Sequence, residues 1–110
     1  MIERQQLLNA ILGNRNVTNV DIRKITLGPG LTAGRHLHPC AVVGFIASGT
    51  AFYQIEGEPA QQLDEGSAFY EPAGKVIADF GNASDSAPMT FIAFYLLDGD
   101  QDLITMLDKK

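Results

Sequence analysis

From Val17 onward, the chain consists of short runs rich in Val, Ile, Thr, Phe and Tyr, broken by turn-forming residues at intervals of roughly 8–12 residues. The turn signals are Gly28-Pro29-Gly30, Gly34, Ser48-Gly49, Glu56 to Pro59, Asp64 to Gly66, Pro72 to Gly74 and Gly81-Asn82. The intervening runs predict strands near residues 20–27, 31–38, 42–47, 50–56, 60–63, 67–71, 75–80 and 89–97. Many short strands at such spacing are typical of an all-β sandwich or barrel.

The two ends of the chain carry a different pattern. Leu7, Leu8, Ile11 and Leu12 are spaced as on one face of a helix, and Gly13-Asn14 supplies a stop. We therefore predict a short helix near the N-terminus and assign the C-terminal segment around residues 103–107 to a second short helix.

Length, charge and cysteine content exclude several classes of protein. A chain of 110 residues corresponds to one domain, so we treat residues 1–110 as a single unit. A net charge of −5, with no run of basic residues, disfavours nucleic acid and anionic membranes as partners. The single cysteine, Cys40, excludes an intrachain disulfide, and the N-terminus lacks the features of a secretory signal. We expect a cytoplasmic protein.

One predicted strand is apolar on both faces. Residues 89–97 read Met-Thr-Phe-Ile-Ala-Phe-Tyr-Leu-Leu, whereas a strand with one face in water would alternate between apolar and polar residues. Something must cover its outer face. We expect a homodimer; the alternative is that the two terminal helices cover the strand.

Two segments of the chain carry a motif. The first contains Gly30, then His36-Leu37-His38, then Gly49, and the second contains Gly66, Pro72, Gly74 and Asn82. In spacing and order these residues resemble the two motifs of the cupin superfamily. The resemblance implies a cupin double-stranded β-helix, a jelly-roll-like barrel, over about residues 17–97, with the terminal segments outside it.

The same resemblance implies a metal site. In cupins, two histidines of the first motif, a Glu after them and a His of the second motif hold one divalent metal, often Fe, Mn, Ni or Zn. Because alternate residues of a strand face the same side, roughly 6.5–7 Å apart, His36 and His38 can both reach one ion. Val42, however, stands at the Glu position and Ile77 at the third His position. Strong metal binding does not follow from the two remaining histidines.

The candidate site residues follow from this alignment. We place His36, His38, Val42, Ile77 and Phe69 in a mostly apolar ligand pocket and name His36 and His38 as candidate metal ligands.

Three further residues are candidates for a role in or near this site. Asp79 lies two residues after Ile77 and could supply a carboxylate, although a solvated Asp is the default. Glu71 shares the parity of Phe69, so it is placed at the pocket mouth, as a general base or, by default, a surface residue. Cys40, two residues after His38, could reach a metal or an oxidant, although a buried structural thiol is the default.

Three functions remain open at this point. The first is a cupin-type protein that binds a small molecule without a catalytic metal. The second is a metal-dependent enzyme of the oxygenase or isomerase type that uses His36 and His38 with a replacement ligand. The third is a structural partner with a vestigial pocket. The sequence alone does not decide whether the protein is an enzyme, because one fold supports many functions.

Overall fold

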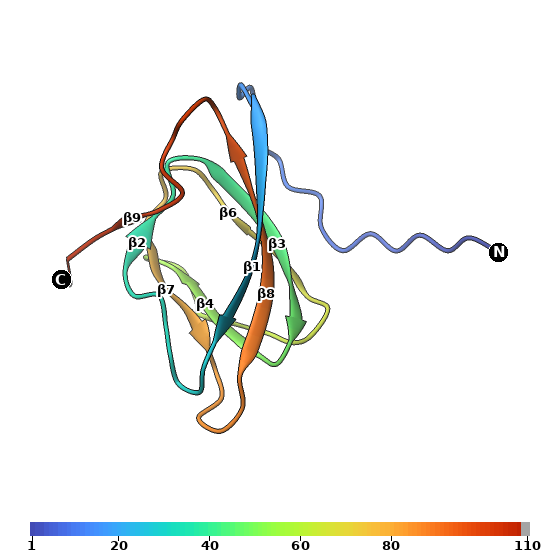
Figure 1. Cartoon of the computed structure of the whole chain (residues 1–110), viewed down its shortest axis with the longest axis vertical. Helices are drawn as coiled ribbons and strands as arrows, with labels where there is room; N and C mark the ends of the chain where they lie inside the picture. The colour runs from blue at the N-terminus through green and yellow to red at the C-terminus, as the bar shows by residue number, and fades with distance from the viewer. Residues whose placement is uncertain (109–110) are drawn as a thin grey trace.

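The computed structural model of the chain describes residues 1–108 and is built of strands (Figure 1). The strands are β1 (Asn19–Leu27), β2 (His36–Leu37), β3 (Ala41–Ser48), β4 (Ala51–Ile55), β5 (Gln61–Leu63), β6 (Ala68–Glu71), β7 (Ile77–Asn82), β8 (Met89–Leu97) and β9 (Thr105–Met106). The prediction of an all-β fold is confirmed. None of the described residues forms a helix long and apolar enough to cross a membrane.

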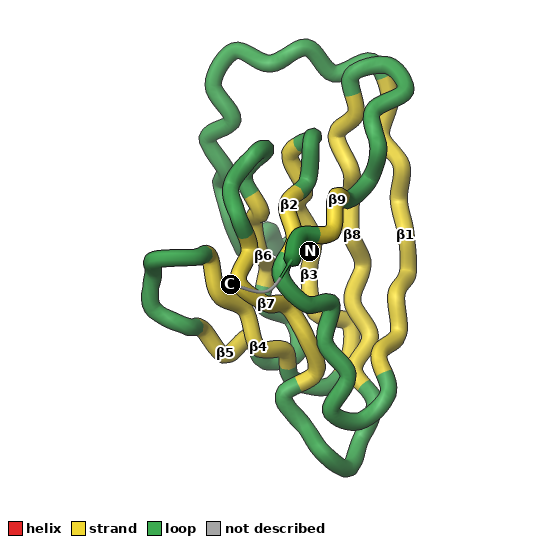
Figure 2. Tube along the Cα trace, turned by 90° about the vertical axis from the view of Figure 1, so that its left-hand side faces the viewer, coloured by secondary structure: helices red, strands yellow, loops and turns green. Residues whose placement is uncertain are grey.

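The strands form two antiparallel sheets that face each other (Figures 1 and 2). One sheet has the order β1-β8-β3-β6 and the other the order β5-β4-β7-β2-β9. Sequence neighbours such as β2 and β3 therefore lie in different sheets, as expected for a jelly-roll-like barrel. The core lies between the two sheets.

Alternation along the strands builds this core. On β8 the residues Met89, Phe91, Ala93, Tyr95 and Leu97 are buried, whereas the residues between them are only half-buried. Four rings from both sheets pack at centroid distances from 4.8 to 6.5 Å. These rings belong to Tyr53, Phe69, Phe80 and Phe91. Edge and tilted packing of this kind adds to the stability obtained from apolar burial.

Gly44 marks a close approach inside the four-stranded sheet. A Cβ atom at this position would overlap the carbonyl oxygen of Ile92 and lie 2.7 Å from Cζ of Phe69. Only glycine lets the inward ring of Phe69 cross over β3 here.

The predicted terminal helices are wrong. Within residues 1–108 no helix is present. A helix of about ten residues is marginal in water without tertiary support. Residues 1–12 run extended instead, and the C-terminal segment forms β9, where Thr105 pairs with Leu37 and Met106 with His36.

The strand predicted at residues 31–38 is mostly loop. Thr32 forms an isolated bridge with Gly81, and only His36 and Leu37 belong to β2. Gly34 interrupts the extended conformation with a φ of 81°, which explains why the strand does not run through.

Candidate metal centre

His36 and His38 enter the barrel from β2 and from the residue just after it. Both side chains are almost fully buried, and their rings meet edge to face at 4.9 Å. His36 pairs with Ile77 on β7 and with Met106 on β9, so the strand that carries it is held from both sides. The prediction that the two imidazoles face the interior together agrees with this geometry.

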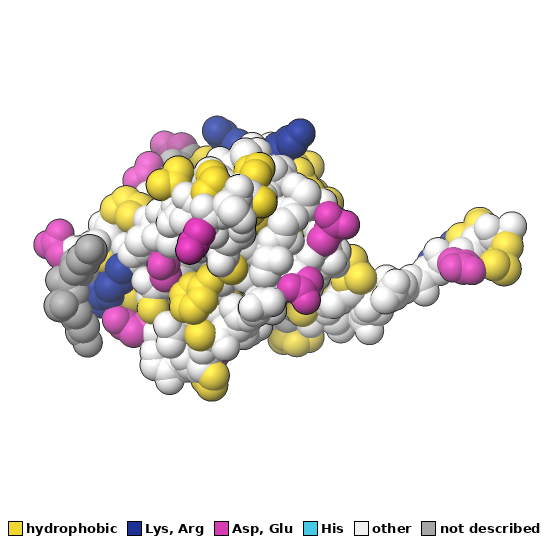
Figure 3. All heavy atoms as spheres, turned by 90° about the horizontal axis from the view of Figure 1, so that it is seen from below, with side chains coloured by type: hydrophobic (Ala, Val, Ile, Leu, Met, Phe, Trp, Pro, Cys, Tyr) yellow, Lys and Arg dark blue, Asp and Glu magenta, His cyan; other side chains and the backbone are white. Residues whose placement is uncertain are grey.

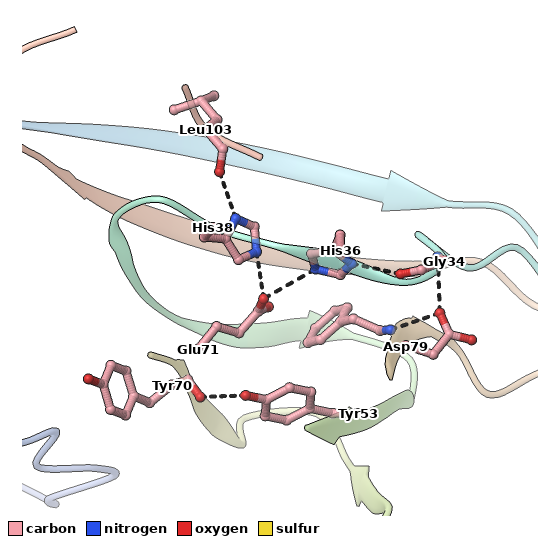
Figure 4. Close-up of polar contacts among 9 residues, drawn as sticks. Gly34, His36, His38, Tyr53, Tyr70, Glu71, Asp79 and Leu103 are labelled. Atoms are coloured by element: carbon pink, nitrogen blue, oxygen red, sulfur yellow. Dashed lines mark hydrogen bonds and ion pairs between the residues drawn. The ribbon is translucent and has the colours of Figure 1, made fainter. Parts of the chain in front are cut away.

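The backbone determines the orientation of both rings (Figure 4). Nδ1 of His36 lies 2.7 Å from the carbonyl oxygen of Gly34, and Nδ1 of His38 lies 2.6 Å from that of Leu103. Because a carbonyl oxygen only accepts hydrogen bonds, each Nδ1 carries the proton and donates it. In the neutral rings, both Nε2 atoms are then left with lone pairs directed into the barrel.

Glu71, the last residue of β6, completes the cluster. Its Oε2 lies 2.5 Å from Nε2 of His38 and 3.4 Å from Nε2 of His36. The residue is only 3% exposed. It is the cross-strand partner of Val42 on β3, so the two side chains share the inner face of the sheet.

This position corrects the expectation for Glu71. The sequence placed it at the pocket mouth or on the surface, whereas it lies buried against both imidazoles. The carboxylate absent at Val42 is supplied from the neighbouring strand, one step across the β3–β6 ladder. Its parity with Phe69 was a correct signal for an inward side chain, but the pairing of β6 with β3 is not visible in the sequence.

The electrostatics of the three groups are coupled. Burial on its own would raise the pKa of Glu71, but hydrogen bonds and charge from His36 and His38 lower it overall. Burial on its own would lower the pKa of His36, but the contact with Glu71 and the Gly34 carbonyl raise it overall. Each Nε2–carboxylate contact is therefore favourable only with a positive charge between the atoms, which a proton or a metal ion supplies.

The donor set fits a divalent metal. The ligand atoms of His36, His38 and Glu71 all lie within 4.8 Å of one another. Metal-binding histidines almost always donate the other ring N–H to a carbonyl or carboxylate, as both rings do here. The single carboxylate offsets part of the charge of a buried dication.

The three donors open onto a small cavity of about 50 Å³. It is lined by Ala33, His36, His38, Val42, Glu71, Phe80, Phe91, Ala93 and Tyr95. Of the predicted pocket residues, His36, His38 and Val42 line it. Ile77 and Phe69 are instead packed in the core. Burial and the charge of Glu71 raise the pKa of Tyr95 to about 12, so its hydroxyl stays protonated beside the cavity.

Asp79 lies outside the cluster. One carboxylate oxygen of Asp79 accepts hydrogen bonds from the backbone N–H groups of Gly34 at 3.1 Å and Phe80 at 2.9 Å. Asp79 therefore braces Gly34, whose carbonyl in turn orients His36 (Figure 4). Cys40 is fully buried, and burial raises the pKa of its thiol. Both features are typical of a structural cysteine that stays protonated.

The family model of the cupin domain matches residues 23–99, and the chain belongs to this family. The Ile77 and Val42 substitutions therefore sit in a true cupin barrel. A search of curated protein sequences gave no match.

Solved structures agree on the fold. A cupin-like protein from Thermotoga maritima matches with a TM-score of 0.70 and 24% identity over 81% of this chain and 65% of its own. The DMSP lyase DddQ from Ruegeria pomeroyi matches with a TM-score of 0.69 and 21% identity over 79% of this chain and 42% of its own. A vicilin from hazelnut (Corylus avellana) gives a TM-score of 0.68 and 14% identity over 79% of this chain and 24% of its own.

The first three matching structures are longer proteins, of which this chain spans 65%, 44% and 42%. At identities below 25%, an enzyme and a vicilin share this barrel equally well. These likenesses show the fold, and the function has to be argued from the site.

Proposed function

We propose that this chain is a metal-dependent cupin that binds one divalent first-row metal through His36, His38 and Glu71. The observation that carries the proposal is the convergence of the three donors, with both Nδ1 atoms engaged by backbone carbonyls and both Nε2 atoms turned to one carboxylate oxygen. In this proposal, Glu71 is the replacement ligand that a metal-dependent enzyme with Val42 at the usual Glu position would require.

The composition of the donor set narrows the reaction class. Two imidazoles and one carboxylate with further positions open form the ligand set of non-haem iron oxygenases. Such a metal, when bound, would supply Lewis acidity and a site for a small ligand. We infer that iron is the functional metal and that the activity is oxidation of a small substrate by dioxygen.

The residues around the donors determine what can bind. A cavity of about 50 Å³ is far below the roughly 300–1,000 Å³ of pockets for drug-sized ligands. It has room for a few water-sized groups. A dication bound by one carboxylate keeps a net positive charge, and Tyr95 lines the same cavity with a phenol that can donate a hydrogen bond. Together these features favour a ligand of few atoms, or the anionic end of a larger one.

The proposal is tested by metal analysis. The protein, purified without a histidine tag, is stripped of metal, loaded separately with Fe(II), Mn(II), Ni(II) or Zn(II), dialysed and measured by elemental analysis. We expect one metal ion per chain, lost in Glu71→Gln and in the double variant His36→Ala/His38→Ala. Glu65→Gln, which neutralises an exposed carboxylate outside the cluster, is the matched control and should bind metal normally.

Two results would contradict this proposal. A metal content near zero after loading would favour the metal-free binding protein, whose pocket would then hold its ligand by the histidines alone. Metal that remains at full stoichiometry in Glu71→Gln would place the site elsewhere. Oxygen consumption by the iron-loaded protein with small organic acids then tests the oxygenase assignment separately.

A further inference from the structure

The outer face of the sheet β1-β8-β3-β6 is apolar across all four strands. The inward positions of these strands fill the core, so the alternate residues point outward. The register aligns them in rows: Ile22, Phe94, Val43 and Tyr70 form one row, and Lys24, Ile92, Phe45 and Ala68 form the next. We call these eight residues, with Val20 and Leu96, the outer face. Within it Ile22 is 59% exposed and Val20 50% exposed.

Residues 1–12, which we call the N-terminal arm, are extended. The start of the arm projects away from the barrel, and its later part runs beside the outer face (Figures 1 and 3). Residues 7–12 of the arm are mostly apolar on both sides. Ala10 and Leu12, on one side, are partly buried. Leu7 and Ile11, on the other side, are 59% and 78% exposed.

A groove of about 370 Å³ separates the arm from its own sheet. It is lined by residues 7–10 and Leu12 of the arm and by Val43, Gly44, Phe45, Ala68, Phe94 and Leu96 of the barrel. The chain therefore covers its outer face only in part. An extended segment loses conformational entropy for every residue held in place, and much of the apolar surface of this arm stays exposed although the barrel lies beside it. Ile11 does not line this groove and is 78% exposed, and Leu7, which lines it, stays 59% exposed, so a second surface is needed to bury them fully.

The charges of the chain favour the outer face of a second copy as that surface. The chain carries 13 acids against 8 Lys and Arg, so two copies have the same net charge and repel each other. The outer face carries no acid, and its one charged residue is Lys24. Two copies can therefore meet here without bringing acids together, and Lys24 is the one charged residue that each copy adds to the contact.

We propose that the chain forms a two-fold homodimer through the outer face, with each N-terminal arm held between its own sheet and that of the partner. Ala10 and Leu12 of the arm pack on their own sheet, and Ile11 and the exposed part of Leu7 pack on the second copy. The same apolar patch then serves both subunits, as a two-fold interface requires. The metal centre lies on the opposite, inner side of this sheet and is not part of the interface.

Light scattering after size-exclusion chromatography tests the assembly at micromolar concentrations. The wild-type chain is expected to elute as a dimer. Ile22→Glu and Ile11→Glu each place a charge in the buried contact and should raise the dimer dissociation constant by about 10-fold or more. Leu31→Glu is the matched control, because Leu31 is 58% exposed but lies outside the outer face and the arm. It should remain dimeric.

A second measurement tests the position of the arm. In dimers mixed from isotope-labelled and unlabelled chains, isotope-filtered NMR should show contacts between the methyl groups of Ile11 and Ile22 of different copies. Two results would overturn the proposal. One is a wild-type chain that is monomeric at these concentrations; the other is a dimer that survives both Glu substitutions. Circular dichroism of each variant establishes that a loss of the dimer is not a loss of the fold.

Discussion

Val42 and Glu71 lie directly opposite each other on β3 and β6, and both side chains point into the barrel. The position that carries the cupin Glu is thus occupied by Val42, while the acid stands one strand away and still reaches both imidazoles. The carboxylate of this site therefore comes from β6 instead of β3. Because directly opposed Cβ atoms lie roughly 4.5–5.5 Å apart, a carboxylate from either position enters nearly the same space.

Exchanging the two side chains tests this equivalence. Glu71→Val alone should reduce metal affinity by about 100-fold or more, since it removes the one anionic ligand. The double variant Val42→Glu/Glu71→Val should recover most of that affinity, measured by competition with a chromophoric chelator. A double variant that binds as weakly as Glu71→Val would mean that the β6 position has a geometry that β3 cannot reproduce.

The metal-free protein should be most stable at mildly acidic pH. The pKa of His36 is raised above its usual 6.5 in the folded protein. Its contribution to the free energy of unfolding is therefore complete below pH 6.5 and is lost as the pH rises through the folded-state pKa. The pKa of Glu71 is lowered below its usual 4.5 in the folded protein. Its contribution to the free energy of unfolding is therefore complete above pH 4.5 and is lost as the pH falls through the folded-state pKa. Both contributions are present between pH 4.5 and 6.5.

Thermal unfolding in the presence of a chelator measures this window. We expect the midpoint temperature to fall on both sides of it, and Glu71→Gln to flatten the profile. Saturating metal should shift the optimum upward, because the imidazoles bind metal only when Nε2 is unprotonated. A midpoint that rises steadily from pH 6.5 to 8 without metal would contradict the proposed His36–Glu71 pair.

The C-terminal segment contacts the site at two points. The Leu103 carbonyl orients His38, and β9 pairs with the strand that carries His36. Truncation after Asp98 should therefore weaken metal binding by roughly 10–100-fold, the usual effect of losing a group that orients a metal ligand. Leu103→Ala keeps the carbonyl and removes side-chain packing, so it should lower thermal stability with little change in affinity. Equal losses of affinity in both variants would assign the effect to packing.

The close approach at Gly44 predicts a severe effect on folding. Gly44→Ala places a methyl group against the Ile92 carbonyl and the Phe69 ring and should cost about 3 kcal/mol or more, or prevent folding. Gly28→Ala is the control, because its added methyl group would lie 3.6 Å from Cδ1 of Leu31, in ordinary contact. Chemical denaturation of the two variants measures the difference. Similar stabilities would show that β3 and β8 can separate to admit a side chain at position 44.

The sequence predicted strands well where the residues of one short segment are enough to define the strand. The boundaries expected at residues 89–97 agree with β8, and the His36-x-His38 spacing places both rings on one side, as the period of a strand requires. The N-terminal helix was wrong for a related reason. Leu7, Leu8, Ile11 and Leu12 fit a helical face, but they also give an extended segment two apolar sides, and the sheet beside it decides between the two.

The sequence by itself determined the barrel, its inward histidines and the absence of the usual Glu and third His at Val42 and Ile77. Only the tertiary structure decided that Glu71 is a member of the site. Its place there depends on the register in which β6 pairs with β3, which brings Glu71 opposite Val42, a residue 29 positions earlier in the chain. The same holds for the Leu103 carbonyl, which reaches His38 from the far end of the chain. Side-chain parity is a property of each strand alone, whereas register and strand order arise only when the sheets assemble.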